Sequence, residues 1–397
     1  MLSIYTSAQP LHLASKIFGF LIFSIENKSF TVTIKNSDYF FIICNIVVNL
    51  LIFCVYWFQF LGENTIDSNV ISKGIPIVTF MQYSISTFVM ILSFIRRKNF
   101  VVILKMFNEI DLILREEFGV KFNYCKERQI VRNIIISLIN GFITIILFCG
   151  IVEVFKTKKI NPKDEIYLFW CLSTTSLVLI NFSFIAFAIK MRFEKVNEVL
   201  RSLQPNFINF ITLKPQIFLA KIKNLSKVHF HITELITEIN KNFSIGILLI
   251  LPPIFAWFCV FLLMILKVQW IIFKTFYVLM IIKMLVVAML DVLLLISIYC
   301  ANKAKCEGIE TAKILFMMKN ENNFDENVEK KISAFIDQIK FMSTKFSCGL
   351  FALDWKLIFK FFSAAIMYFI IMVQFDNLST SNGTNQKFEN FTNFTGN

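Results

Sequence analysis

The residues best suited to chemistry lie in the last long apolar stretch of the chain, residues 357–375. From Phe361 on, the polar side chains of this stretch are Ser363, Tyr368 and Gln374, and the acid Asp376 follows it. Met367 and Ile371 lie seven and three residues before Gln374, which puts all three on one stripe of a helix. If several copies surrounded an axis, the stripe would form an apolar constriction topped by carboxamides and carboxylates, as in cation pores. In a single chain it would be ordinary helix packing.

A second feature is the pair of ionisable residues Lys283 and Asp291, which interrupts another apolar stretch. Charged groups are costly inside a bilayer and are functional candidates there by default. The pair is separated by about two helical turns, which is too far for a simple ion pair. Two interpretations of Asp291 stay open: it bonds a neighbouring helix, or it lines a hydrated cavity.

No arrangement of residues indicates catalysis or metal binding. His229 and His231 lie two residues apart on a stretch of helical character, a spacing that turns the two rings away from each other. The sequence has no phosphate-binding glycine loop, no nucleophile elbow and no HExxH or CxxC motif. Asp111, close to Glu116 and Glu117, is typical of a solvated helix face. We therefore expect no enzyme, no catalytic residue, no metal, no cofactor and no nucleic-acid partner.

The composition is that of a membrane protein. Of 397 residues, 56% are hydrophobic and 17% are charged, whereas soluble proteins average roughly 45–50% and 25%. A spanning helix needs about 20 mostly apolar residues. Seven stretches meet this requirement: 39–61, 74–95, 134–154, 166–189, 245–266, 278–300 and 357–375. The sequence therefore predicts an all-α membrane protein with seven transmembrane helices.

The distribution of Lys and Arg predicts the orientation, because cytoplasmic loops carry more of both. With the N-terminus inside, the four inner segments hold 30 of the 40 basic residues and the four outer segments hold 8. The C-terminus is then extracellular. Four N-glycosylation sequons in the tail agree with this orientation; they begin at Asn377, Asn382, Asn390 and Asn393.

The long inner segments show helical periodicity. Their apolar stripes are Ile103, Phe107, Ile110 and Leu114; Phe193, Val196, Leu200 and Leu203; and Ile332, Phe335, Ile336 and Ile339. Charged residues such as Arg192 and Lys195 alternate with the stripes. We expect the membrane helices to continue into the cytoplasm and to pack there as a helical bundle. The alternative is a set of amphipathic helices lying on anionic lipid.

The end of the last span resembles a known family. Met367-Tyr368, five apolar residues and Gln374-Phe375 look like the Thr-Tyr, five apolar, Gln-Phe signature of insect gustatory receptors, with Met367 in place of Thr. Residues 346–354 are similar to the segment that leads into the last span in that family. The architecture is shared with insect odorant receptors, and the intact Gln374-Phe375 end favours the gustatory family.

The resemblance implies a tastant-gated, non-selective cation channel in the plasma membrane of sensory dendrites. It implies a homotetramer, or a heteromer with related receptors, that passes Na⁺, K⁺ and Ca²⁺. The pore falls on Ile371, Gln374 and Phe375, and Asp376 would concentrate cations at its mouth. The implied division of the chain is 1–38 cytoplasmic N-terminus; 39–300 six-helix ligand-sensing region; 301–356 cytoplasmic anchor helices; 357–375 pore helix; 376–397 extracellular tail.

The expected ligand is a small organic tastant, held in the outer half of each subunit and surrounded by membrane lipid. Aromatic faces with a few hydrogen-bonding groups suit such a molecule. Candidate contacts are Trp57, Gln82, Tyr83, Trp170, Thr174 and Asp291. Each of these side chains would equally serve as interfacial belt or core packing.

Three alternatives compete with a gustatory channel. A receptor that signals through G proteins needs the opposite topology, against which the basic residues and sequons argue. An odorant receptor subunit shares the architecture. A secondary transporter would favour internal repeats and paired broken helices, which the sequence lacks.

Overall fold

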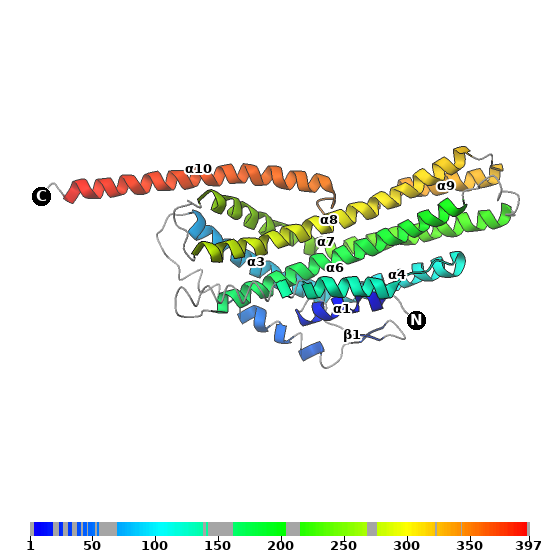
Figure 1. The fold of residues 1–397 in the computed structure, drawn as a ribbon, viewed down its shortest axis with the longest axis horizontal. Helices are drawn as coiled ribbons and strands as arrows, with labels where there is room; N and C mark the ends of the chain where they lie inside the picture. The colour runs from blue at the N-terminus through cyan, green and yellow to red at the C-terminus, as the bar shows by residue number, and fades with distance from the viewer. Residues whose placement is uncertain are drawn as a thin grey trace.

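The computed structural model describes residues 4–18, 24–26, 31–33, 38–40, 43–45, 47–51, 54, 70–137, 140–141, 162–203, 215–267, 276–321, 324–342 and 344–394. The elements, labelled as in Figure 1, are α1 (Ile4–Ile17), β1 (Ser24–Glu26), β2 (Thr31–Thr33), α3 (Val70–Ile95), α4 (Arg97–Phe118), α6 (Pro162–Leu203), α7 (Pro215–Lys267), α8 (Phe276–Glu321), α9 (Glu326–Phe341) and α10 (Trp355–Phe394). Residues 124–137 are also helical.

The described chain is mainly helical, with one short antiparallel hairpin and an isolated β-bridge between Ser347 and Ala352 in the loop before α10. Strand β1 pairs with β2, with Ser24 opposite Thr33. The sequence pattern does not predict this hairpin, because strands of three residues are too short to show an alternating period.

The predicted spans correspond to long helices where the structure describes them. Four helical segments are long and apolar enough to cross a membrane: Ile77–Ile95, Leu172–Leu203, Gln216–Leu263 and Trp355–Phe375. They match the second, fourth, fifth and seventh predicted spans, and α8 contains the sixth. Most of the third span and the end of the first lie outside the described residues.

Helices α6, α7 and α8 are much longer than a membrane is thick. They contain 42, 53 and 46 residues, which corresponds to about 60–80 Å each against about 30 Å of hydrocarbon. In Figure 1 they run along the long axis of the molecule, and the contacts between α6 and α8 are the most extensive. Each helix therefore continues well beyond any bilayer it crosses.

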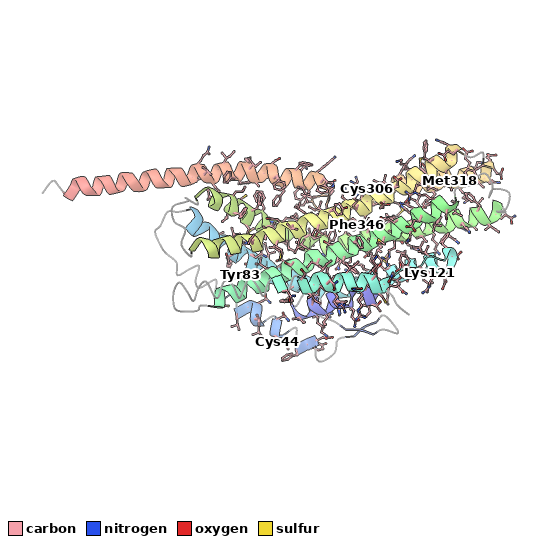
Figure 2. All side chains as sticks on the ribbon, viewed as in Figure 1. Cys44, Tyr83, Lys121, Cys306, Met318 and Phe346 are labelled. Carbon is pink, nitrogen blue, oxygen red and sulfur yellow. The ribbon has the colours of Figure 1, made fainter. Side chains whose placement is uncertain are left out.

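The extensions pack as a helical bundle, as the periodicity predicts. All the members of the three apolar stripes are buried, and Ile103, Leu114, Phe193, Val196, Leu200 and Ile332 are fully buried. They form one core with α7 and with the loop residue Phe346, which is labelled in Figure 2. The stripes therefore pack on one another within the chain rather than on lipid. That the bundle is cytoplasmic stays a prediction.

Asp111, which the pattern assigns to a solvated helix face, is instead buried, and so is Arg192, which alternates with an apolar stripe. Asp111 of α4 and Arg192 of α6 form a bidentate ion pair: Nε donates to Oδ1 at 2.9 Å and a terminal nitrogen donates to Oδ2 at 2.7 Å. Arg192 is 0% exposed and also donates to the carbonyl of Ala188. The prediction of a solvated face is therefore wrong for Asp111. The reason is that a second helix covers each charge and supplies its partner.

The end of α4 folds back over this ion pair. Gly119 takes the left-handed conformation (φ +66°); its N–H donates to the carbonyl of Arg115, and the N–H of Val120 donates to that of Leu114. This turn favours glycine because a side chain is strained there. It brings the Phe122 ring to within 4.8 Å of the Arg192 guanidinium carbon. Tyr124 donates to Asp111 at 2.5 Å.

Removing one partner of this pair should be strongly destabilising. We expect Asp111→Asn to cost about 3–5 kcal/mol of unfolding free energy, because it leaves a buried cation unpaired. The double variant Asp111→Leu with Arg192→Met should recover most of that loss. Lys190→Met is the control, since it breaks only a partly exposed pair with Glu194 worth at most about 1 kcal/mol. Unfolding of the detergent-solubilised protein measures all three. A double variant no more stable than the single one would contradict the prediction.

A histidine buried in the same bundle makes stability depend on pH. His229 lies between the rings of Phe193 and Phe335, and its Nε2 lies 3.3 Å from the carbonyl oxygen of Gly308. Burial lowers the pKa of His229 from 6.5 to about 4, opposed by the bond to Gly308. His231 faces Glu234 instead, so the two rings diverge as the spacing predicts.

The bundle should lose stability as the pH falls below about 6.5. The unfolded chain binds a proton there that the folded chain does not, which costs about 1.4 kcal/mol per pH unit down to about pH 4. Between pH 7 and pH 5 we expect a loss of about 2 kcal/mol from this group. His229→Gln should flatten the dependence and His231→Gln should not, as measured by unfolding at the two pH values. Equal slopes for the two variants would show that His229 does not cause the effect.

Candidate functional site

Helix α10 packs on its neighbours along one side only. Phe361, Ala365 and Tyr368 recur at helical spacing and face α7: the ring of Phe255 meets Phe361 and Tyr368 edge to face, with centroids 5.3 Å and 5.6 Å apart. Ala365 is fully buried. The rest of the helix is open. Only 11% of its most apolar window is buried, against 83% for the corresponding window of α6.

The predicted pore residues lie on this loosely packed helix. Ile371, Gln374 and Phe375 are all exposed in the single chain. Met367, Ile371 and Gln374 fall on a stripe turned away from the face that packs on α7, because their spacing from Ala365 places them on another side of the helix. Tyr368, the remaining residue of the motif, is half exposed and contacts Phe255.

The backbone of α10 continues without a break past Phe375 to Phe394. In Figure 1 it extends beyond the neighbouring helices to the C-terminus. Asp376 and the sequon residues Asn377, Asn382, Asn390 and Asn393 lie on this extension, and their side chains are outside the described residues. The predicted boundary between span and tail therefore does not coincide with a helix end.

Buried, uncharged polar residues of α3 and α6 form a neutral polar layer around the contact between Gln82 and Thr175, and three of the predicted ligand contacts are among them. Gln82, Tyr83 and Thr174 are each at most 2% exposed. The amide of Gln82 donates to the hydroxyl of Thr175 at 2.8 Å, which ties the two helices together. Tyr83 is labelled in Figure 2 within the bundle. The structure thus brings together residues more than 90 positions apart in the sequence.

Sequence reasoning missed the other members of this layer. Ser86, Ser173 and Ser176 are also buried, and their hydroxyl oxygens have no hydrogen-bond partner among the described residues; neither has the carbonyl oxygen of Gln82. Buried polar atoms of this kind are costly unless they are paired. The run Ser173-Thr174-Thr175-Ser176 inside an apolar span was the signal that could have identified them.

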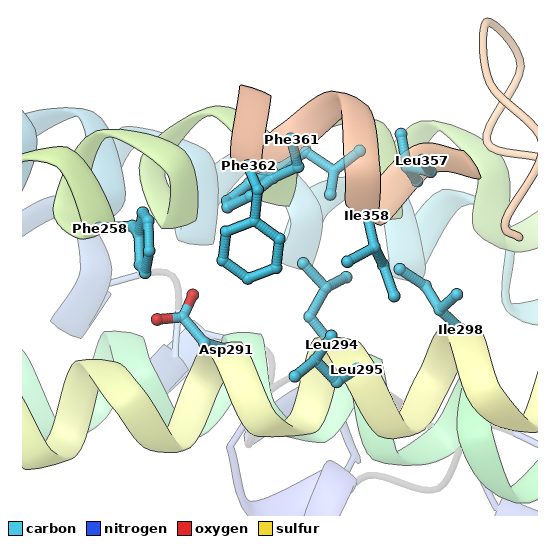
Figure 3. Close-up of a pocket in the computed structure, with 10 residues that line it drawn as sticks. Phe258, Asp291, Leu294, Leu295, Ile298, Leu357, Ile358, Phe361 and Phe362 are labelled. Atoms are coloured by element: carbon cyan, nitrogen blue, oxygen red, sulfur yellow. The ribbon is translucent and has the colours of Figure 1, made fainter. Parts of the chain in front are cut away.

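Asp291 lies apart from this layer. It lines a pocket of about 40 Å³ between α7, α8 and α10, whose other walls are apolar. Figure 3 shows its carboxylate directed toward Phe258 and Phe362. Its Oδ1 is buried and has no hydrogen-bond partner in the described part of the chain. The pocket has room for water, so the geometry favours a cavity over a bond to a neighbouring helix.

The two remaining predicted contacts are not described. Trp57 and the side chain of Trp170 lie outside the described residues. Within the described part of the chain, no group of three or more His, Cys, Asp or Glu residues could hold a metal ion. The chemistry that the described residues offer is therefore hydrogen bonding by amides and hydroxyls within apolar walls.

Comparisons with known proteins agree with this architecture. The insect olfactory receptor OR5 from Machilis hrabei superposes with a TM-score of 0.66 at 10% sequence identity, covering 92% of this chain and 97% of that one. The same receptor in complex with eugenol gives 0.55 at 11% identity, with the same coverage of both chains. At this identity the likeness shows a shared fold. No curated protein matches the sequence.

The sequence itself matches a family model. The model of the 7tm chemosensory receptors aligns with residues 8–379, which is nearly the whole chain. This confirms the resemblance to insect chemoreceptors that the end of the last span indicates. The protein is a multi-pass membrane protein and belongs to the 7tm chemosensory receptor family.

Proposed function

We propose that the protein is a gustatory receptor that acts as a tastant-gated, non-selective cation channel. The observation that carries the proposal is the open side of α10. A helix with 21 consecutive, mostly apolar residues that packs against its own chain along one side leaves a stripe for other copies. Four such helices around an axis would bury that stripe and line a pore. Gln374, the polar residue of the stripe, would then face the permeating ions.

The proposed pore chemistry follows from the residues of the stripe. Met367 and Ile371 form an apolar constriction, which gates by excluding water. Gln374 offers neutral dipoles to hydrated cations, so discrimination among Na⁺, K⁺ and Ca²⁺ is weak. Asp376 adds negative charge at the mouth and raises the local cation concentration. Losing the family's Thr at Met367 leaves the Gln374-Phe375 end intact.

The proposed ligand site is the polar layer between α3 and α6. It has buried hydrogen-bonding atoms without partners, and none of its described members carries a charge. Such a layer suits a small, neutral organic molecule with a few polar atoms. The solved complex of an olfactory receptor of this fold with eugenol supports a ligand of that size and polarity.

The gustatory assignment rests on the end of α10. An odorant receptor subunit is the second candidate, and the likeness to an olfactory receptor fits it equally well because the fold is common to both. The Gln374-Phe375 pair favours taste. Coupling to G proteins is disfavoured by the basic residues and the tail sequons, which support an inside N-terminus, an extracellular tail and glycosylation at Asn377 or its neighbours.

The assembly and its location belong to the same proposal. We infer a homotetramer, or a heteromer with related receptors, in the plasma membrane of sensory dendrites. The bundle of α9 with the ends of α4, α6, α7 and α8 would be the cytoplasmic anchor. The six predicted spans within residues 39–300 would form the sensing region.

The first test is whole-cell current from cells that express this chain alone, with G-protein signalling blocked. We expect tastants to evoke a cation current, and Gln374→Ala to change its reversal potential or unitary conductance. Tyr368→Phe is the matched control, because that side chain faces Phe255 and should leave permeation unchanged. Asp376→Asn should lower conductance by about twofold or more at low salt and little at high salt, since salt screens the charge. Unaltered permeation in Gln374→Ala would contradict the proposed pore.

A second test separates the ligand site from the pore. We expect Gln82→Met to raise the half-maximal tastant concentration about tenfold, because one buried hydrogen bond is lost. The maximal current should stay the same. Ser84→Ala is the control, since its hydroxyl bonds only to Phe80 of its own helix. The same dose–response curve for Gln82→Met and the wild type would place the ligand elsewhere.

A further inference from the structure

A large cavity in the described part of the chain lies away from both sites above. Its volume is about 330 Å³, and its walls come from α1, the helix of residues 124–137, α6 and α8. Ligand pockets occupy about 300–1,000 Å³, so the cavity has room for one compact molecule. Several lining residues, among them Ile130, Phe187 and Ile296, are more than one-third exposed. The cavity is therefore open at the surface of the bundle.

The walls are apolar with one acidic exception. Of the lining residues, ten are apolar, Ser183 and Cys300 are weakly polar, and Glu127 is the acid. The carboxylate of Glu127 accepts a hydrogen bond from Ser7 of α1 at 3.1 Å. Within the described part of the chain it forms no ion pair.

The cations near this carboxylate are already engaged. Arg192 acts on Glu127 electrostatically, but its Nε and one terminal nitrogen bind Asp111 and another nitrogen binds the carbonyl of Ala188. Lys190 lies over the ring of Phe187 at the rim and pairs with Glu194 at 2.7 Å. Arg192 and Asp111 cancel each other, and Lys190 and Glu194 do the same. Within the described residues, Glu127 is therefore left at the cavity wall with a hydrogen bond from Ser7 but without an ion-pair partner.

Such a carboxylate beside an apolar cavity defines the chemistry of a ligand. A half-buried charge is stabilised by a cation within hydrogen-bond reach, and the stabilisation increases where water is excluded. Consistently, burial raises the pKa of Glu127, and Arg192 only partly opposes this. An ammonium group would satisfy the carboxylate, and an apolar body would fill the rest of the space.

We propose that this cavity is a second ligand site that takes a compact hydrophobic amine, with its ammonium group on Glu127 and its apolar body against Phe184 and Phe187. The site is separate from the polar layer between α3 and α6, whose described members are neutral. The proposal does not depend on the channel mechanism, because no residue of α10 lines this cavity.

The test uses two probes of the same shape, 1-adamantanamine and 1-adamantanol, on the full-length protein in phosphatidylcholine nanodiscs. Cys300 lines the cavity, so an occupant should slow its alkylation by N-ethylmaleimide, measured by mass spectrometry of its peptide. Cys306 is exposed on the same helix and is the internal control. We expect the amine to protect Cys300 at concentrations about tenfold lower than the alcohol, and neither to protect Cys306.

Two variants separate charge from space. Glu127→Gln keeps an acceptor for Ser7 and should bring the amine's potency down to that of the alcohol. Ile296→Trp should fill the cavity and abolish protection by both probes while Glu127 stays in place, so the proposal remains testable if the first variant misfolds. Equal potency of the two probes on the wild type, or no protection by either, would overturn the proposal. Protection by phosphatidylethanolamine alone would assign the cavity to lipid instead and would also overturn it.

Discussion

The ion pair between Arg192 and Asp111 is the constraint around which the helical bundle of the extensions is organised. A guanidinium and a carboxylate that lose all contact with water are stable together only if the geometry is good and the remaining hydrogen-bonding capacity is used. Both conditions hold here: the contact is bidentate, Tyr124 donates to the same carboxylate, and Ala188 accepts from the same guanidinium. Because each partner comes from a different element, α4, α6 and the helix of residues 124–137 are fixed in one register.

The same network reaches α1. Ser7 donates to the carbonyl of Tyr124 and to Glu127, both at 3.1 Å, so the first helix is held by groups that themselves depend on the ion pair. This part of the molecule is therefore rigid by construction. Helix α10 differs in its packing: among its described residues, one side contacts neighbouring helices and most of the other side chains are exposed. The proposed channel, in which α10 would move against a fixed bundle, would need this division of stability.

The sequence predicted what depends on period and composition, and missed what depends on partners. Apolar stripes such as Ile103 to Leu114 give the correct buried faces, because a helix that must bury one side shows it in its own spacing. The burial of Asp111 and Arg192 was not predicted because their pairing joins residues 81 positions apart, and neither helix alone shows which charge another helix covers.

Gln82 and Thr174 were singled out by residue type and position, and both are buried. Ser173 and Ser176 were missed although they flank Thr174. The helical course of α10 after Phe375 was not expected, because its Ser, Thr, Asn and Gly residues have low helix propensity.

Two kinds of buried polar group occur in the molecule, charged pairs and neutral amides or hydroxyls. Where α4 and α6 meet, buried polarity takes the form of full charges that neutralise each other. Between α3 and α6 it takes the form of amides and hydroxyls, several of them without partners. A neutral polar layer can exchange its bonds with a ligand at low cost, because no charge has to be desolvated. A buried ion pair cannot do so without a penalty of several kcal/mol. The ion pair between Asp111 and Arg192 is thus costly to exchange, whereas the neutral layer is less so, which agrees with its proposed role as the ligand site. The exceptions, Asp291 and Glu127, are acids at apolar cavities without a charged partner, and for that reason they are where a cation or water would be recognised.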